Sequence, residues 1–217
     1  MQIMFDNFYI VFVKLNISGG NMKDKTTFLK NLSIVIVVAL MGILLIASYF
    51  IPVMGASKNY DTSSYSCRDV VVAMKAESRD DLYNEAIIAA NAGISEYEGK
   101  QGKIIRAVGV LGMINAMIGA ALLICAIATI FIKGNILRIS SIAFAVAALC
   151  VSITIIALLC VYLGGLTELQ YSYSYYYAIK AGSFVMMAAS LFGGTGAWFL
   201  GFFDKEKHHI ESKEERI

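Results

Sequence analysis

Two pairs of neighbouring side chains have the residue types of a catalytic or metal-binding site. Asp80-Asp81 supplies two carboxylates, as in general acid–base catalysis, and His208-His209 supplies two imidazoles, which are common zinc ligands. The histidines point in different directions on a helix and have no third ligand at a suitable spacing. A carboxylate three residues after Ser78 is instead typical of a helix start. With the motifs of hydrolases and P-loops also missing, we expect no catalytic residue, metal or cofactor.

The four cysteines do not form the pattern of a disulfide-stabilised domain. Cys125, Cys150 and Cys160 lie inside apolar runs, and Cys67 stands alone in a polar segment. We expect four free thiols, three of which act as small apolar side chains. A Cys67–Cys160 bond is the alternative, and it requires Cys160 to lie near the outer surface.

Asn115 is the most polar side chain well inside an apolar run. A buried amide needs a hydrogen-bond partner, so we expect Asn115 to face another helix and to hold the two helices together. The alternative is that Asn115 lines a path for an ion or a solute. Four hydroxyl side chains in the apolar runs are expected to bond to their own helix backbones: Thr129, Ser152, Thr154 and Thr195.

A tyrosine-rich segment offers two interpretations. Its members are Tyr171, Tyr173, Tyr175, Tyr176 and Tyr177. Aromatic side chains collect at membrane interfaces, so the segment predicts a belt that anchors the neighbouring helix. Tyrosine-rich surfaces also bind partners well, because a tyrosine gives a large contact area at a small entropy cost.

Four apolar runs position these side chains: 32–53, 104–132, 139–164 and 181–203. Each is long enough to cross a bilayer core of about 30 Å as a helix, and Arg106 is the only ionised residue in any of them. Charged residues make up 16% of the chain, against roughly 25% in soluble domains. We therefore predict an all-α integral membrane protein with a four-helix transmembrane bundle.

Polar segments connect the four predicted helices. The segment 54–103 is a long outer loop, in which apolar residues at helical spacing predict an amphipathic helix over about 79–97. Within the same loop, 69–74 fits either a short helix or a strand. The short connection 133–138 predicts an antiparallel helical hairpin. The segment 165–180 is a second outer loop that contains the tyrosines.

Basic residues near the predicted helix ends give the orientation. They fall in three segments that we assign to the cytoplasm: 1–31, 133–138 and 204–217. The loop 54–103 has six basic and eight acidic residues, a composition that is readily exported. We therefore expect both termini in the cytoplasm of a plasma membrane, and the Ile- and Lys-rich composition favours a bacterial one.

The N-terminal region allows more than one interpretation. Met22 begins a basic segment followed by an apolar run, which gives the hypothesis that Met22 is the true start. The alternative is that residues 1–21 form an interfacial amphipathic segment. Residues 22–56 also resemble a secretory signal, but their apolar run exceeds the 7–15 residues of a signal core. We expect a retained first helix.

Small residues form two stripes at helical spacing. One comprises Ala189, Gly193, Ala197 and Gly201, and the other comprises Gly112, Ala116 and Ala120. Small residues allow helices to approach closely in lipid, where association depends on packing. The stripes predict either contacts within the bundle or an interface between copies of the chain.

The outline of inside termini, long first outer loop, short inner turn and shorter second outer loop resembles that of claudin-like and other tetraspan proteins. The claudin loop motif pairs Trp with two Cys, whereas this first outer loop has one Cys and no Trp. The tetraspanin Cys-Cys-Gly motif is absent as well. No functional residue is therefore carried over from these families.

The expected function is interaction or assembly in a membrane without catalysis. The partners would be the lipid bilayer and another membrane protein or further copies of the chain, with the chain as an accessory subunit, receptor or immunity-type protein. Nucleic acid is not an expected partner, because the net charge is +2 and no basic stripe lies outside the membrane flanks. The alternative is an oligomeric channel or transporter subunit.

Overall fold

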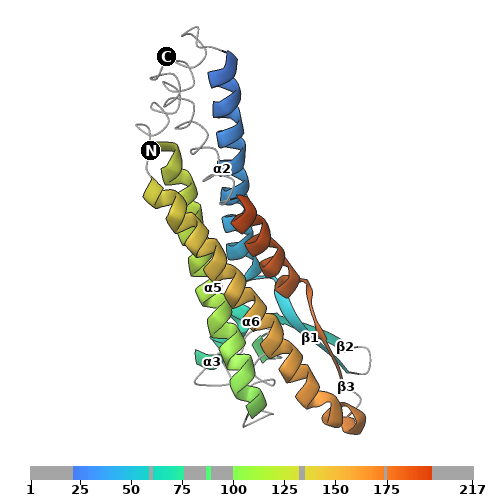
Figure 1. The fold of residues 1–217 in the computed structure, drawn as a ribbon. Coiled ribbons are helices and arrows are strands. Elements are labelled where there is room, and N and C mark those ends of the chain that lie inside the picture. The colour runs from blue at the N-terminus through green and yellow to red at the C-terminus, as the bar shows by residue number, and fades with distance from the viewer. Residues whose placement is uncertain are drawn as a thin grey trace.

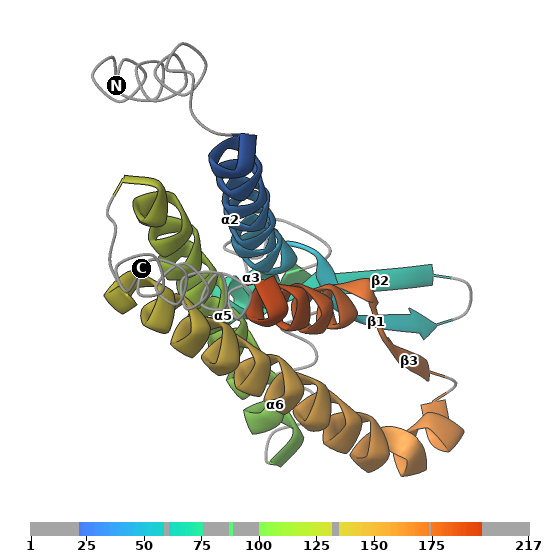
Figure 2. The same cartoon turned by 45° about the horizontal axis from the view of Figure 1, so that its top comes forward.

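The computed structural model of the protein describes residues 22–58, 61–75, 87–88, 100–131, 135–173 and 175–196, and most of them are helical (Figure 1). The main helices are α2 (Met22–Ser48), α3 (Cys67–Lys75), α5 (Lys100–Phe131), α6 (Asn135–Tyr173) and a last helix over residues 181–196. The strands are β1 (Pro52–Lys58), β2 (Asp61–Ser66) and β3 (Tyr175–Ile179). Figure 2 shows the strands projecting to one side of the helices.

Helices α5 and α6 are long and apolar enough to cross a membrane. Their apolar segments are Gln101–Thr129 and Ile139–Gly165, and each exceeds a bilayer core of about 30 Å at about 1.5 Å per residue. Only 28% of the most apolar window of each helix is buried within the protein, whereas a core helix of a soluble protein would be mostly buried. The outward apolar surface favours membrane insertion.

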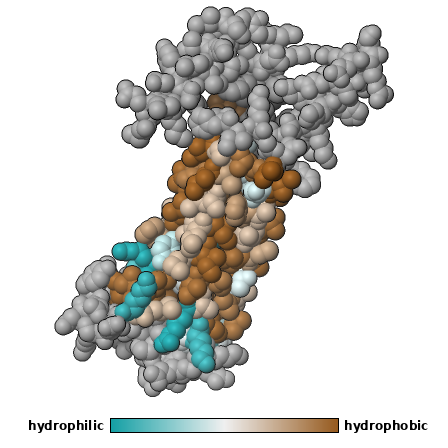
Figure 3. Space-filling model, turned by 90° about the vertical axis from the view of Figure 1, so that its left-hand side faces the viewer, coloured by the Kyte–Doolittle hydropathy of each residue, from teal (hydrophilic) through white to brown (hydrophobic). Residues whose placement is uncertain are grey.

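The outward apolar surface continues over the other helices. Side chains at least 60% exposed include Met117 and Ile124 on α5, Ile139 on α6 and Phe192 on helix 181–196. On α2, Ile36 and Leu40 are each 50% exposed. Figure 3 shows this apolar belt across the middle of the molecule, with hydrophilic side chains gathered below it.

The prediction of a helical protein is confirmed in part: most described residues are helical, but the chain is not all-α, because three segments form an antiparallel sheet in the order β2-β1-β3. Helix α2 ends at Ser48 rather than at residue 53, since Pro52 follows and proline disfavours a helical residue before it. Strand β3 contains Tyr175, Tyr176 and Tyr177, a residue type with a high preference for strands.

Other predicted boundaries also change. Helix α6 continues to Tyr173, so residues 165–173 are helical and the segment 165–180 is not a loop. Residues 135–138 also belong to α6, which shortens the predicted connection 133–138. The segment 69–74 lies in the helix α3. Most of the predicted helix 79–97 lies outside the described residues, although residues 87–88 are helical and Ile87 is buried.

Buried residues recur on α5 and α6 at alternating spacings of three and four. The buried series on α5 is Ile105, Val108, Gly112, Asn115, Gly119, Leu122 and Ala126, and that on α6 is Ser141, Ala145, Ala148, Ser152, Ile155, Leu159 and Tyr162. This seven-residue repeat is the pattern of left-handed coiled coils, in which neighbouring helices cross at a small angle. The two long helices therefore pack side by side, as Figure 1 shows.

Glycines on α5 set how closely other helices approach. A methyl group added at Gly119 would lie 2.7 Å from Leu45 Cβ and 3.0 Å from the backbone oxygen of Gly42, both on α2. A methyl group at Gly42 would lie 2.9 Å from Gly119 O. Real Cβ atoms do not make such short contacts, so the α2–α5 crossing requires glycine on both sides.

We predict that Gly119→Ala destabilises the protein while Gly164→Ala does not. The Gly119 methyl group would push α2 away at a cost of about 1–3 kcal/mol, the usual range for overpacking. A methyl group at Gly164 meets nothing within 4 Å, and alanine gains up to about 1 kcal/mol over glycine in a helix. Unfolding by SDS in mixed micelles gives both values. Equal effects of the two substitutions would contradict the close crossing.

Candidate functional site

A layer of polar side chains lies between two apolar cores. Asn115 on α5 donates from Nδ2 to Ser152 Oγ on α6 at 3.1 Å, and Ser152 Oγ lies 3.0 Å from Ser190 Oγ on helix 181–196. All three side chains are at most 1% exposed. On one side lies the core that includes Leu122 and Ala148, and on the other lies the core that includes Ile155. The polar layer therefore links α5, α6 and helix 181–196 at the point where the three helices contact one another.

The hydroxyl hydrogens in this layer are too few for every short contact. Ser152 can donate to Ala148 O at 2.8 Å, and Ser190 can donate to Met186 O at 2.7 Å. Each serine carries one hydroxyl hydrogen, so the 3.0 Å contact between them forms only when one serine gives up its helix carbonyl. Either serine can therefore be the donor in this contact.

The amide oxygen of Asn115 is buried and has no hydrogen-bond partner among the described residues. An unpaired buried acceptor costs about 1–3 kcal/mol. The rest of the layer has no ionisable group, since its other members are the serines Ser152 and Ser190. The layer can therefore orient helices and accept one further hydrogen bond at Asn115 Oδ1, but it cannot act as an acid or base near neutral pH.

We predict a measurable coupling between Asn115 and Ser152. Ser152→Ala removes the only recorded partner of a buried amide, whereas in an Asn115→Leu background the same change leaves no amide unpaired. The loss of unfolding free energy should therefore be smaller in that background, by about 0.6 kcal/mol and at most about 1.7 kcal/mol. A double-mutant cycle in mixed micelles measures it, and strictly additive losses would contradict the hydrogen bond.

Helix α3 is seated on α5 by two further glycines. A methyl group at Gly109 would lie 2.6 Å from Val70 Cγ1, and one at Gly112 would collide with the side chain of Cys67. Val70 and Cys67 are fully buried. As the α3 residue number rises from 67 to 70, the facing α5 residue number falls from 112 to 109, so the two helices run in opposite directions.

The start of α3 is held by a reciprocal cap. Asp69 Oδ2 accepts hydrogen bonds from Ser66 N at 2.8 Å and from Ser66 Oγ at 2.7 Å, while Asp69 N donates to Ser66 Oγ at 3.3 Å. A serine followed three residues later by a carboxylate is the sequence signature of this cap. Arg68 N also donates to Tyr49 O at 3.2 Å, which ties the same turn to the end of α2.

All four cysteines are free thiols, as expected, and the Cys67–Cys160 alternative is wrong. Cys67 is buried against α5 and Cys160 is exposed on α6, so the two side chains do not meet. Burial raises the pKa of the Cys67 thiol to about 12, with a smaller contribution from the negative charge of Asp69. A thiol with this pKa stays protonated and is a poor nucleophile near neutral pH.

We predict that Cys67 makes the stability fall at alkaline pH. The folded state holds the thiol proton up to about pH 12, whereas the unfolded chain loses it near its ordinary pKa of about 8.5. The stabilisation is therefore complete below the unfolded pKa and is lost as the pH rises toward the folded pKa. Comparing unfolding free energies at about pH 8 and about pH 10 should show a steeper fall in the parent than in Cys67→Ala. Parallel curves would contradict a buried, neutral thiol.

The sheet is fastened to the helices where β3 leads into helix 181–196. Lys180 N donates to Val53 O at 2.9 Å, and Ser183 Oγ donates to the same oxygen at 3.5 Å. A methyl group at Gly182 would lie 2.6 Å from Ile51 O and 2.7 Å from Pro52 O. Only glycine therefore allows the start of this helix to lie against the chain between α2 and β1.

The register shows which backbone groups of β3 face outward. The Lys180–Val53 hydrogen bond continues a register that pairs Ala178 with Gly55 and Tyr176 with Ser57. Hydrogen-bonded and non-hydrogen-bonded pairs alternate in antiparallel sheets, so Ala178 and Tyr176 bond to β1. The N–H and C=O groups of Tyr177 then point to the other edge of β3. Within the described part of the chain, no strand pairs with that edge.

The predicted small-residue stripes take part in different contacts. A methyl group added at Gly193 would lie 3.3 Å from Met41 Cβ on α2. Ala189 lies in the core shared with α5 and α6. Gly112 contacts α3, while Ala116 and Ala120 are half-buried. Two more predicted members and the histidine pair lie outside the described residues: Ala197, Gly201 and His208-His209.

The predicted tyrosines are divided between two elements. Tyr171 and Tyr173 lie in the last turn of α6, whereas Tyr175, Tyr176 and Tyr177 lie in β3. Each hydroxyl side chain assigned to its own helix does bond there: Thr129 to Cys125 O, Thr154 to Cys150 O and Thr195 to Phe192 O, besides Ser152.

Sequence reasoning missed Ser190, the cap at Ser66 and Asp69, and the glycines at the helix crossings. The cap had a readable signal, because the spacing of Ser66 and Asp69 is the same as the one noted at Ser78. The Gly42–Gly119 contact had no signal in the sequence, since a glycine in an apolar helix does not show which neighbouring helix it faces.

Neither the described metal-binding residue types nor a comparison with known proteins indicates a reaction or a ligand for this chain. Among the described residues, no group of three His, Cys, Asp or Glu side chains is placed to hold a metal ion. Comparison with protein-family models, curated proteins and solved structures finds no match to this chain. A functional interpretation therefore depends on the arrangement of the chain alone.

Proposed function

We propose that the protein is a multi-pass membrane protein that binds a partner protein through its outer sheet. In this proposal α2, α5, α6 and the run 181–203 each cross the membrane, with both chain termini on the cytoplasmic side. The exposed apolar belt on these helices supports insertion. The basic residues beside the predicted inner ends, among them Lys133 and Arg138, support the orientation.

The edge of β3 with which no described strand pairs is the observation that carries the binding role. Its outward backbone groups can form hydrogen bonds with a strand of another protein, a mode of recognition known as β-augmentation. An unpaired edge is a risk for uncontrolled pairing unless another segment covers it. Three consecutive tyrosines on this strand suit a contact surface, because tyrosines bury a large area at a small entropy cost.

The attachment of the sheet makes its edge a rigid surface. Val53 O receives hydrogen bonds from Lys180 and Ser183, and Val53 and Met54 on β1 are fully buried. A strand held in this way loses little further freedom when it pairs with a partner, which favours affinity. The helices then act as the anchor that holds the sheet at the membrane surface.

A channel or transporter subunit is the second candidate, and the unpaired Oδ1 of Asn115 favours it. An intramembrane polar atom with a free acceptor could contact a solute or a water molecule in an oligomer. Solute flux through reconstituted vesicles that disappears in Asn115→Leu would support this candidate. Vesicles that remain impermeable support the binding role.

We predict that Tyr177→Pro abolishes partner binding while Tyr177→Ala weakens it less. Proline removes the outward N–H at position 177 and leaves the hydrogen bonds between β3 and β1 in place. Alanine keeps that N–H and removes only the aromatic ring. The measurement is photo-crosslinking in native membranes from a benzophenone side chain at position 178, whose alanine is exposed.

The control carries the benzophenone at Ile124, which is 66% exposed on the apolar belt. A defined crosslinked protein from position 178 that is lost in Tyr177→Pro supports the proposal. Crosslinks from position 124 alone, or crosslinks from position 178 that survive proline, would overturn it. Unfolding in mixed micelles checks that Tyr177→Pro remains folded.

A further inference from the structure

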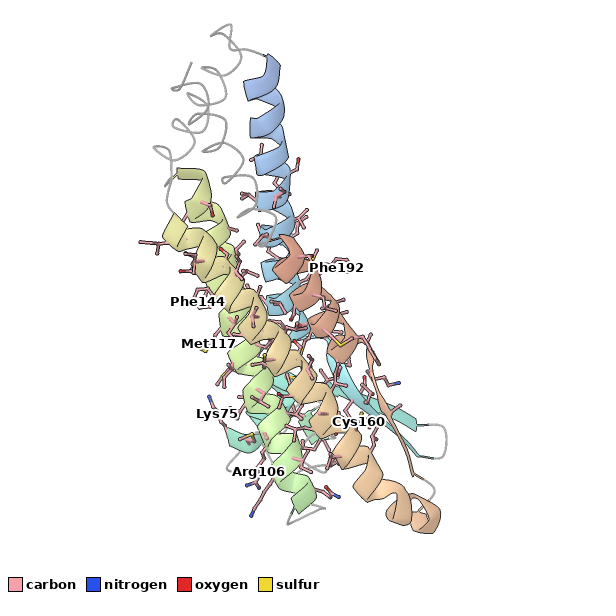
Figure 4. All side chains as sticks on the ribbon, viewed as in Figure 1. Lys75, Arg106, Met117, Phe144, Cys160 and Phe192 are labelled. Carbon is pink, nitrogen blue, oxygen red and sulfur yellow. The ribbon has the colours of Figure 1, made fainter. Side chains whose placement is uncertain are left out.

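Three exposed basic side chains lie together at the lower border of the apolar belt. Lys75 ends α3, which runs antiparallel to α5, so it lies beside the first turns of α5. Lys103 and Arg106 are exposed on these turns, one helical turn apart. Figure 4 shows Lys75 and Arg106 on the same side of the molecule. We name Lys75, Lys103 and Arg106 the basic triplet.

Among the side chains that the structure describes, no carboxylate pairs with the basic triplet. Asp69 is the only acidic residue whose side chain the structure describes, and it caps the opposite end of α3 through Ser66. All three basic side chains of the triplet are exposed and can reach a charged group outside the protein. Long basic side chains can extend from an apolar surface to reach polar groups at a membrane boundary.

An exposed apolar stripe continues from the triplet along the same face of α5. Exposed side chains that follow Arg106 on this face are Val110, Met113, Met117 and Ile124, spaced three, four or seven residues apart. Met74 on α3, beside Lys75, is 40% exposed and adds to the end of the stripe next to the triplet. A positive cluster joined to a long apolar stripe matches the two parts of a phospholipid, a charged headgroup and its acyl chains.

We propose that the basic triplet binds the phosphate of an anionic membrane lipid, whose acyl chains lie along the α5 stripe. This inference rests on the proposed membrane insertion. The triplet supplies the charge recognition, with Arg106 able to hold two phosphate oxygens at once. The apolar stripe supplies the preference for a lipid over a free anion, because an inorganic phosphate leaves the stripe uncovered.

Native mass spectrometry of the full chain, released from detergent, tests the proposal. The probes are phosphatidylglycerol and phosphatidylcholine with the same acyl chains. The parent protein should bind phosphatidylglycerol roughly tenfold more tightly, and Lys103→Gln/Arg106→Gln should lower that affinity to the phosphatidylcholine level. Lys180→Gln, an exposed lysine on the sheet side, is the matched control and should keep the preference.

Three results would overturn the lipid site. They are equal affinity of the parent for the two lipids, a preference that survives the double substitution, and displacement of phosphatidylglycerol by millimolar inorganic phosphate, which would indicate a free-anion site. Alkaline carbonate extraction of cell membranes tests the underlying premise separately. Release of the protein by carbonate would contradict membrane insertion, whereas retention without lipid preference would contradict only the basic triplet.

Discussion

Close approach to the backbone of α5 is the constraint on which the rest of the structure depends. Gly119 allows α2 to lie close to the α5 backbone, and Gly109 and Gly112 of α5 allow the same for α3. Under the proposed membrane insertion, no water drives the apolar helices together, so the contact area gained by close packing must hold them. The glycines of α5 therefore position both α2 and the helix α3 that follows the sheet strand β2.

The polar layer complements this packing by fixing the register of the helices. Small and apolar residues at a seam tolerate sliding by one turn, because one alanine or leucine resembles the next. Asn115, Ser152 and Ser190 meet only in one alignment of three helices. A slip would bury the amide of Asn115 without Ser152 as its partner, at a cost of about 1–3 kcal/mol, while the two serines keep the carbonyls of their own helices. The layer thus selects one arrangement among several of similar packing.

Length and composition were sufficient to predict the two long apolar helices, and the polarity of Asn115 was sufficient to identify it as unusual. The sheet was not predictable in the same way, because its strands are short and the pairing of Met54 with Ile179 joins distant segments. The contact face between α5 and α6 could not be predicted, because both helices are apolar on every side. Buried and exposed positions therefore have similar hydropathy in the sequence. The partner of Asn115 could not be predicted either. A serine that bonds to its own helix looks the same in the sequence whether or not it also faces an amide.

The order of strands has a consequence for biosynthesis. Strand β1 lies between β2 and β3, but β2 follows it directly while Ile179 follows Met54 by 125 residues. At about 5–20 residues per second, roughly 6–25 s of translation separate the two. During that interval β3 is missing from its edge of β1, and the two long apolar helices α5 and α6 must be synthesised before β3 emerges. Completion of the sheet is therefore a late event that follows the synthesis of α5 and α6, and a chain that stops before residue 175 would display the edge of β1 instead of the edge of β3.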